Sequence, residues 1–107
     1  MVVIINGIEY SVHYEENETT RCFKAHFPQE YRMAELNGNE KYVYMDYSLP
    51  AYQSCPKHIN AGDIMLFGDD CLVIFYKSFK TFYSYTRMGH IDNLPELGKG
   101  SITAYFE

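Results

Sequence analysis

Short apolar runs separated by turn residues extend along the whole chain, and they predict a protein built mostly from β-strands. Asn6-Gly7 lies between two β-prone runs and is a strong signal for a two-residue hairpin turn. Asn37-Gly38-Asn39 and Gly68-Asp69-Asp70 separate further pairs of runs, because Gly, Asn and Asp supply the backbone angles of tight turns. The predicted strands are residues 2–5, 8–14, 30–36, 41–45, 64–67, 71–76, 82–88 and 101–106.

Three segments depart from this strand pattern. Residues 17–20 read NETT and offer capping side chains, and apolar residues then recur at helical spacing up to Pro28, which predicts a helix over about residues 19–27. Residues 92–97 predict a single helical turn. Residues 46–60 contain two prolines and no sustained period, and a loop of this length in a small domain is often functional. We expect this loop to form one wall of a groove.

The run CLVIFY at residues 71–76 is almost continuously apolar, which is typical of a strand covered on both faces. We expect it to form the core together with residues 64–67. Asp69 and Asp70 then lie at a hairpin tip, where two solvated carboxylates without further ligands do not predict a metal site. The sequence predicts one domain, residues 1–107, with a mostly β fold: a closed, mainly antiparallel β-barrel of about eight strands with one short helix.

The charge balance narrows the range of partners. The formal net charge is -5, and the nine Lys and Arg residues form no basic run, so neither nucleic acid nor an anionic membrane surface is an expected partner. Cys22, Cys55 and Cys71 are too widely spaced for a disulfide framework or a metal clamp, and they suit a reducing cytoplasm. The chain has no signal-peptide pattern, no phosphate-binding or dinucleotide-binding motif and no histidine metal spacing, so we expect a soluble cytoplasmic protein without a metal or cofactor.

The segment NAGDIMLFGDDCLVIFYKSFKTFYSYTRMGHID, with LNGNEKYVYM upstream, resembles the small bacterial cyclophilin-like domains. The similar elements are Gly62-Asp63 before a strand, the strand at residues 71–76, and YTRMGHID at residues 85–92. The resemblance covers nearly the whole chain. It implies a minimal cyclophilin-like β-barrel of unknown function.

Cyclophilins catalyse the cis/trans isomerisation of X-Pro bonds with an arginine beside an aromatic and aliphatic pocket, and the arginine favours the twisted amide. This chain lacks the F-H-R and F-M-x-Q-G-G segments of that family and contains no Trp. No catalytic residue is therefore carried over by match. If the protein is an isomerase, Arg87 is the candidate catalytic residue.

The candidate binding residues follow from strand alternation. Arg87 shares strand parity with Tyr83 and Tyr85, so one face of the predicted strand presents two rings and a guanidinium that suit a peptide or a planar ligand. The alternative is a half-exposed strand whose arginine pairs with Asp92 or Glu40.

Tyr42 and Tyr44 lie on one face of another predicted strand and are expected to edge the same groove, although tyrosines are also common at barrel rims. Tyr76 is either at a cavity mouth or in the core, and His58 is either an acid or base of the long loop or a solvated residue. His90 follows a glycine at a strand end, and Asp92 is placed to orient its ring.

Three functions follow as hypotheses. The first is a binding module, without strong catalysis, which recognises a peptide segment or a small ligand in a groove lined by tyrosines and Arg87. The second is a divergent peptidyl-prolyl cis/trans isomerase. The third is an interaction partner of a flavodoxin-type redox protein, which only the resemblance implies. The oligomeric state is left open.

Overall fold

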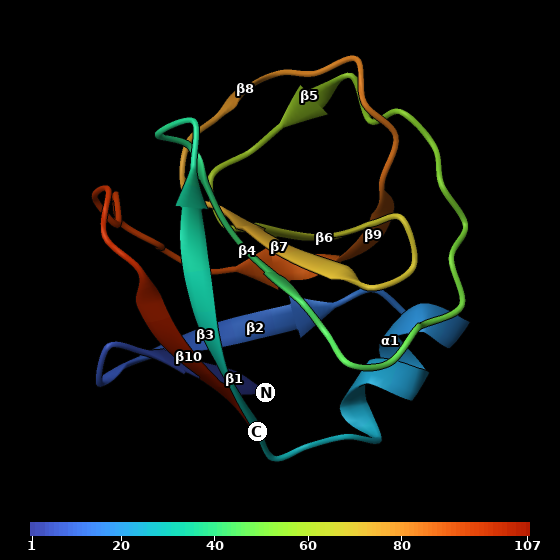
Figure 1. Cartoon of the computed structure of the whole chain (residues 1–107), viewed down its shortest axis with the longest axis horizontal. Coiled ribbons are helices and arrows are strands. Elements are labelled where there is room, and N and C mark those ends of the chain that lie inside the picture. Colours follow the sequence, from blue (N-terminus) through green and yellow to red (C-terminus); the bar gives the residue numbers. More distant parts are fainter.

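The computed structural model describes residues 1–107 and has a wall of eight antiparallel strands that closes into a barrel (Figure 1). In order around the barrel, the strands are β1 (Val2–Ile5), β10 (Ile102–Phe106), β3 (Gln29–Leu36), β4 (Glu40–Tyr44), β7 (Cys71–Phe75), β6 (Asp63–Phe67), β9 (Thr86–Ile91) and β2 (Ile8–Tyr14). The first and last strands pair with each other, so the two termini lie side by side. The predicted closed, mostly β barrel is confirmed.

A separate two-stranded sheet lies outside this wall. It pairs β5 (His58–Ile59) with β8 (Phe79–Lys80) and arches over β6 and β7 at the top of Figure 1. The residues expected to form a long loop, 46–60, therefore contain a short strand, and Ser54 also forms an isolated β-bridge with Tyr85. The arch is built from two segments that lie about twenty residues apart in the sequence.

The predicted hairpins form where the turn residues demand them. Asn6 and Gly7 have φ of 49° and 85°, and Asn37 and Gly38 have φ of 56° and 67°, which are left-handed values that Asn and Gly adopt most readily. Gly68-Asp69-Asp70 forms the tight turn between β6 and β7. The carbonyl oxygens of that turn accept hydrogen bonds from the backbone of the segment after β4, so the turn has a structural role.

The single helix, α1 (Glu18–Lys24), begins and ends close to the predicted limits. Asn17 caps it by accepting a hydrogen bond from the backbone N–H of Thr20 at 2.9 Å. Phe23 is fully buried and packs edge-on against Phe27 and Phe106, which fixes the helix against the lower end of the barrel (Figure 1). No helix of the protein is long and apolar enough to cross a bilayer.

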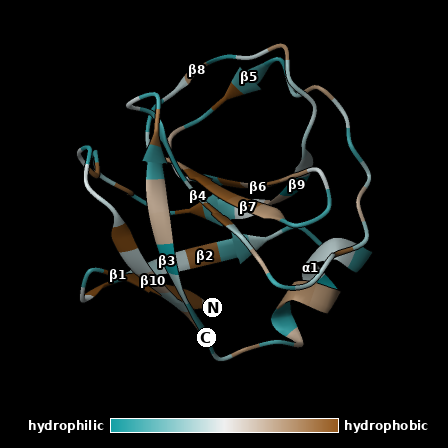
Figure 2. Ribbon diagram, in the orientation of Figure 1, coloured by the Kyte–Doolittle hydropathy of each residue, from teal (hydrophilic) through white to brown (hydrophobic).

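The core has two parts, and β7 separates them. Leu72 and Ile74 face the barrel interior and join a cluster to which every barrel strand except β4 contributes buried residues. Cys71, Val73 and Phe75 face outward and pack under the β5–β8 arch. In Figure 2 the most hydrophobic segments lie in the strands of the wall, while the connecting turns are hydrophilic. The prediction that residues 71–76 are covered on both faces is confirmed.

Two local predictions are wrong. The strand expected at residues 82–88 begins at Thr86, because residues 81–85 cross the outside of the barrel as an irregular segment. The register of β6 against β9 also shifts between Ile64 and Met65, which leaves Met88 as the extra residue of a β-bulge. Residues 92–97 form a turn and an irregular segment instead of a helical turn.

Candidate functional site

The outer faces of β4 and β7 form the floor of a pocket. Both strands bury alternate residues in the barrel, so the remaining residues point outward in register. The paired outward positions are Glu40 with Phe75, Tyr42 with Val73, and Tyr44 with Cys71. The strands thus present one carboxyl and two tyrosines beside an apolar row.

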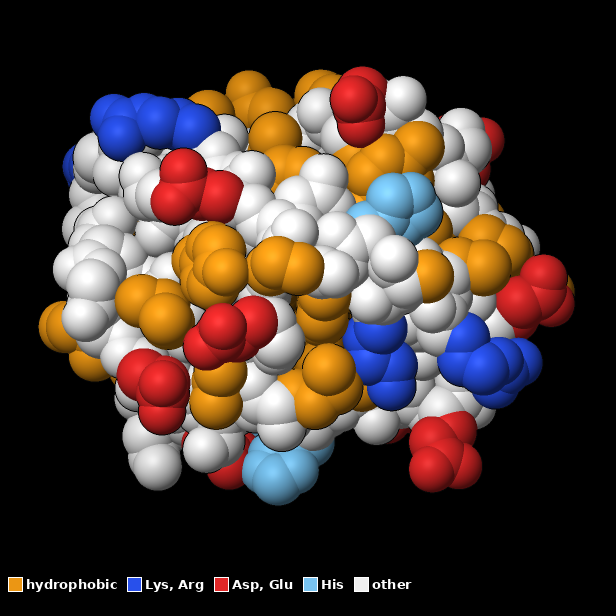
Figure 3. Space-filling model, turned by 90° about the horizontal axis from the view of Figure 1, so that it is seen from below, with side chains coloured by type: hydrophobic (Ala, Val, Ile, Leu, Met, Phe, Trp, Pro, Cys, Tyr) orange, Lys and Arg blue, Asp and Glu red, His pale blue; other side chains and the backbone are white.

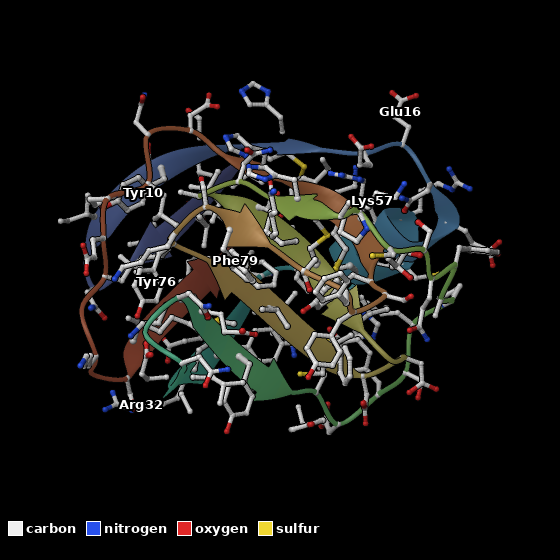
Figure 4. All side chains as sticks on the ribbon, turned by 90° about the horizontal axis from the view of Figure 1, so that it is seen from above. Tyr10, Glu16, Arg32, Lys57, Tyr76 and Phe79 are labelled. Atoms are coloured by element: carbon white, nitrogen blue, oxygen red, sulfur yellow. The ribbon has the colours of Figure 1, made fainter.

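Residues 79–85 form the opposite wall. Phe75 anchors this wall to the floor, since its ring centroid lies 5.5 Å from that of Phe79 and 5.6 Å from that of Tyr85. Backbone hydrogen bonds of 3.0 Å between Ser54 and Tyr85 fix the far end of the wall. In Figure 4, Phe79 lies over the strands at the centre of the view. The wall is therefore held at both ends.

The space between floor and wall has a volume of about 480 Å³, which lies within the range of small-molecule sites. Fifteen residues line it and ten of them are hydrophobic. They are Leu36, Asn37, Asn39, Glu40, Tyr42, Tyr44, Phe67, Cys71, Val73, Phe79, Lys80, Thr81, Phe82, Tyr83 and Tyr85. We call this space the aromatic pocket.

The mouth of the aromatic pocket carries large apolar side chains in solvent. Phe82 is 98% exposed, Tyr83 66% and Tyr44 63%, and the rings of Tyr83 and Phe67 meet edge to face with centroids 6.4 Å apart. On the face seen from below in Figure 3, hydrophobic side chains instead alternate with charged ones. Exposed aromatic side chains that gather around one opening are typical of a recognition surface.

Glu40 gives the aromatic pocket its one carboxyl group. The residue is 9% exposed, and burial, followed by the nearby negative charge of Glu35, raises the pKa of its carboxyl to about 7. The neighbouring Lys41 does not compensate, because strand alternation turns it into the barrel. A carboxyl with this pKa exchanges its proton near neutral pH.

The thiol in the floor of the pocket is not a nucleophile at neutral pH. Burial raises the pKa of Cys71 to about 11, and the negative charges of Asp70 and Glu40 act in the same direction. Only the thiolate attacks, so the protonated Cys71 is inert there.

Four of the predicted binding residues converge on one place. Tyr42 and Tyr44 from the floor and Tyr83 and Tyr85 from the wall all line the aromatic pocket. Arg87 does not join them: it is exposed on β9 and lines no cavity, although it was expected to share a face with both wall tyrosines. Strand parity does not extend back to Tyr83, because the chain before Thr86 is irregular.

Tyr76 lies inside the structure and away from the pocket mouth. Its hydroxyl donates a 2.7 Å hydrogen bond to Glu35, and burial, followed by that hydrogen bond, raises its pKa. The Lys41 ammonium donates to Glu35 at 2.9 Å and to the carbonyl oxygens of Gly98 and Gly100 at 2.6 Å each. The hydrogen bonds from Lys41, Tyr76 and the backbone outweigh the effect of burial and leave the pKa of Glu35 below its usual value. This network has a structural role.

His58 is separate from the aromatic pocket as well. It lines a second cavity of about 460 Å³ with Cys55 and Lys57, and that cavity shares residues 80–82 with the aromatic pocket. His58 thus lies beside the site and outside its lining.

The pairings of the other histidines correct one expectation. Asp92 does not orient His90: its carboxylate pairs with His13 at 2.7 Å, and His90 pairs with Asp63 at 3.2 Å. The partners follow from strand pairing: Asp63 lies opposite His90 on β6, and the backbone N–H of Asp92 donates to Ser11 of β2, two residues before His13. No three His, Cys, Asp or Glu side chains come together in a metal-binding arrangement.

The sequence-based reasoning missed Glu40, Asn39 and the rings of Phe67, Phe79 and Phe82 as lining residues. For Glu40 the signal was present, because it stands two residues before Tyr42 and therefore on the same face of the strand. The phenylalanines carried no local signal, since the pairing of β6 with β7 places Phe67 beside Cys71, and the arch and the segment after it bring Phe79 and Phe82 to the pocket.

Comparison with known proteins relates this geometry to one family. Residues 3–107 match the family model described as the cyclophilin-like family. No curated protein and no solved structure matches the chain.

Proposed function

This chain belongs to the cyclophilin-like family, and on that premise we propose that it is a binding module that holds a peptide segment in its aromatic pocket. One observation carries the proposal. Of the eight large hydrophobic side chains that the protein exposes, five line this pocket. They are Leu36, Tyr44, Phe67, Phe82 and Tyr83.

A peptide segment fits this arrangement for a physical reason. The cavity accommodates a side chain, and the exposed rings around its mouth offer apolar surface to the chain on either side of that side chain. Aromatic residues dominate the energetics of such interfaces because they bury a large area at a small entropic cost. The anchored wall keeps the pocket open before the peptide arrives, which reduces the ordering cost of binding.

The geometry gives less support to prolyl isomerisation. In that mechanism an arginine donates a hydrogen bond to the twisted amide. The three arginines of this chain, Arg21, Arg32 and Arg87, all lie outside the linings of both cavities. Binding to a flavodoxin-type redox protein stays a prediction from the resemblance alone. We therefore propose binding in preference to catalysis.

The test uses acetylated and amidated pentapeptides in which a central residue, X, between paired glycines is varied over the amino acids. Each peptide is titrated into the protein while the amide NMR shifts are followed. We expect at least one X to shift amides of residues 40–44, 71–73 and 79–85, and we expect Tyr83→Ala to weaken that binding about tenfold. Tyr52→Ala is the matched control, because Tyr52 is 60% exposed and lies outside the pocket. The proposal would be overturned if the amide NMR shifts scattered over the surface for every X. It would also be overturned if Tyr83→Ala and Tyr52→Ala lost equal amounts of binding affinity.

A further inference from the structure

The aromatic pocket contains a carboxyl group without a counter-charge. Glu40 is the only acidic residue in the lining, and none of the four ion pairs of the protein includes it. Its neighbour Lys41 is committed on the other side of the strand to Glu35 and two carbonyl oxygens. Burying a carboxylate without a partner is costly, so the pocket favours a ligand that brings a positive charge.

The surroundings of Glu40 also suit a cation. Tyr42, Tyr85 and Phe79 supply aromatic faces, which attract ammonium and guanidinium groups, most strongly where water is excluded. Asn39 lines the pocket beside Glu40, and its side-chain oxygen is buried without a hydrogen-bond partner. The Asn39 oxygen and the Glu40 carboxylate are therefore acceptors without a donor, and a cationic N–H group supplies one.

We infer that the pocket takes a cationic side chain of the bound peptide, a lysine or an arginine, with its apolar stem against the tyrosine rings and its charged end at Glu40. This inference rests on the proposed function and adds the chemical class of the ligand. Lys80 is the one basic residue of the lining, and it lies exposed on β8 without an ion pair to Glu40. An exposed charge of this kind is screened over about 8 Å at physiological ionic strength, so it opposes the incoming cation only weakly.

Binding of a cation is linked to the proton on Glu40. Glu35 from β3, Cys71 from β7, Tyr76 after β7 and Tyr85 from the wall are the titratable groups that interact with this carboxyl. Since burial and the negative charge of Glu35 hold the pKa of Glu40 at about 7, a bound cation lowers that pKa and releases a proton below neutral pH. Affinity for a cationic peptide therefore rises with pH from about 6 to 8, while the lysine ammonium stays charged because its ordinary pKa is about 10.4.

The experiment compares pentapeptides whose central residue is lysine or arginine with peptides that carry norleucine or citrulline instead. Citrulline keeps the length of the arginine side chain, norleucine is shorter than lysine by the terminal nitrogen alone, and both replacements remove the charge. Calorimetry and NMR titration are run at pH 6 and pH 8 in two buffers of different ionisation enthalpy, with the wild type, Glu40→Gln and Glu9→Gln. Glu9 is exposed on β2 and is replaced with the same change in net charge.

We expect a charged peptide to bind about tenfold more tightly than its neutral counterpart at pH 8, as a charge-assisted hydrogen bond provides. We also expect proton release at pH 6, loss of both effects in Glu40→Gln, and no change in Glu9→Gln. If charged and neutral peptides bind the pocket with equal affinity, and Glu40→Gln does not change that affinity, this inference is overturned and the proposed function stands. If no peptide changes the amide NMR shifts of the pocket residues, both this inference and the proposed function fail.

Discussion

Replacing Glu40 by Gln tests whether the pocket carboxyl is held in an unfavourable environment. Burial and Glu35 move its pKa from 4.5 to about 7 on folding, so the folded protein binds more protons than the unfolded chain between these values. Stability therefore falls as the pH rises through this window, and the cost persists above pH 7. The amide of Gln removes that cost because it carries no charge at any pH.

The size of the effect follows from the same shift. A move from 4.5 to about 7 corresponds to about 3 kcal/mol, because one pKa unit is worth about 1.4 kcal/mol. The carboxyl faces a cavity that water enters, so screening reduces this to about 1–2 kcal/mol. We expect Glu40→Gln to stabilise the protein by this amount at pH 8 and to leave its stability almost unchanged at pH 4.5.

The assay is urea unfolding followed by tyrosine fluorescence and circular dichroism at both pH values. Glu9→Gln controls for the change in net charge and is expected to shift the midpoint equally at both pH values. If Glu40→Gln is destabilising at pH 8, or if its effect does not depend on pH, the carboxyl is not desolvated as the structure indicates. Equal slopes of the unfolding curves for both variants would show that the comparison concerns stability alone.

Three further predictions concern the frame around the pocket. Gly89→Ala is expected to destabilise the protein by about 1–3 kcal/mol in urea unfolding, because an added Cβ would lie 2.5 Å from a carbonyl oxygen of β2. Gly100→Ala is the control, and it is expected to change the stability little because the space around Gly100 is open. Lys41→Met is expected to cost about 3–5 kcal/mol, since it leaves the half-buried Glu35 carboxylate without its ion-pair partner and two carbonyl oxygens without their donor. A thermal midpoint equal to that of the wild type would contradict this role. A thiol reagent at pH 8 is expected to label the exposed Cys55 much faster than Cys71, because burial raises the pKa of Cys71 to about 11. Equal labelling rates of the two thiols, measured by mass spectrometry, would refute the buried position of Cys71.

The hairpins and the central strand were predictable because local rules determine them. Asn-Gly pairs adopt left-handed backbone angles more easily than other residues do, so the turns at Asn6-Gly7 and Asn37-Gly38 follow from the residues themselves. The unbroken apolar run of residues 71–76 required cover on both faces wherever it lay in the fold. The capping residues before α1 similarly set where the helix starts.

The pocket was predictable only in part. Alternation along β4 placed Tyr42 and Tyr44 on one face, and the same rule places Glu40 beside them. It failed between Tyr83 and Arg87, because the segment before β9 leaves the sheet to pair with Ser54.

The sequence by itself thus determined the hairpin turns and most strands of the barrel wall, because backbone preferences and side-chain alternation act between residues close in the chain. Only the tertiary structure decided that two pairs of tyrosines about forty residues apart line one pocket together with Glu40, and that Arg87 and Tyr76 lie elsewhere. The arch formed by β5 and β8 and the bulge in β9 depend on pairing between distant segments. The energy of such pairing comes from packing in the finished fold, and no local pattern encodes it.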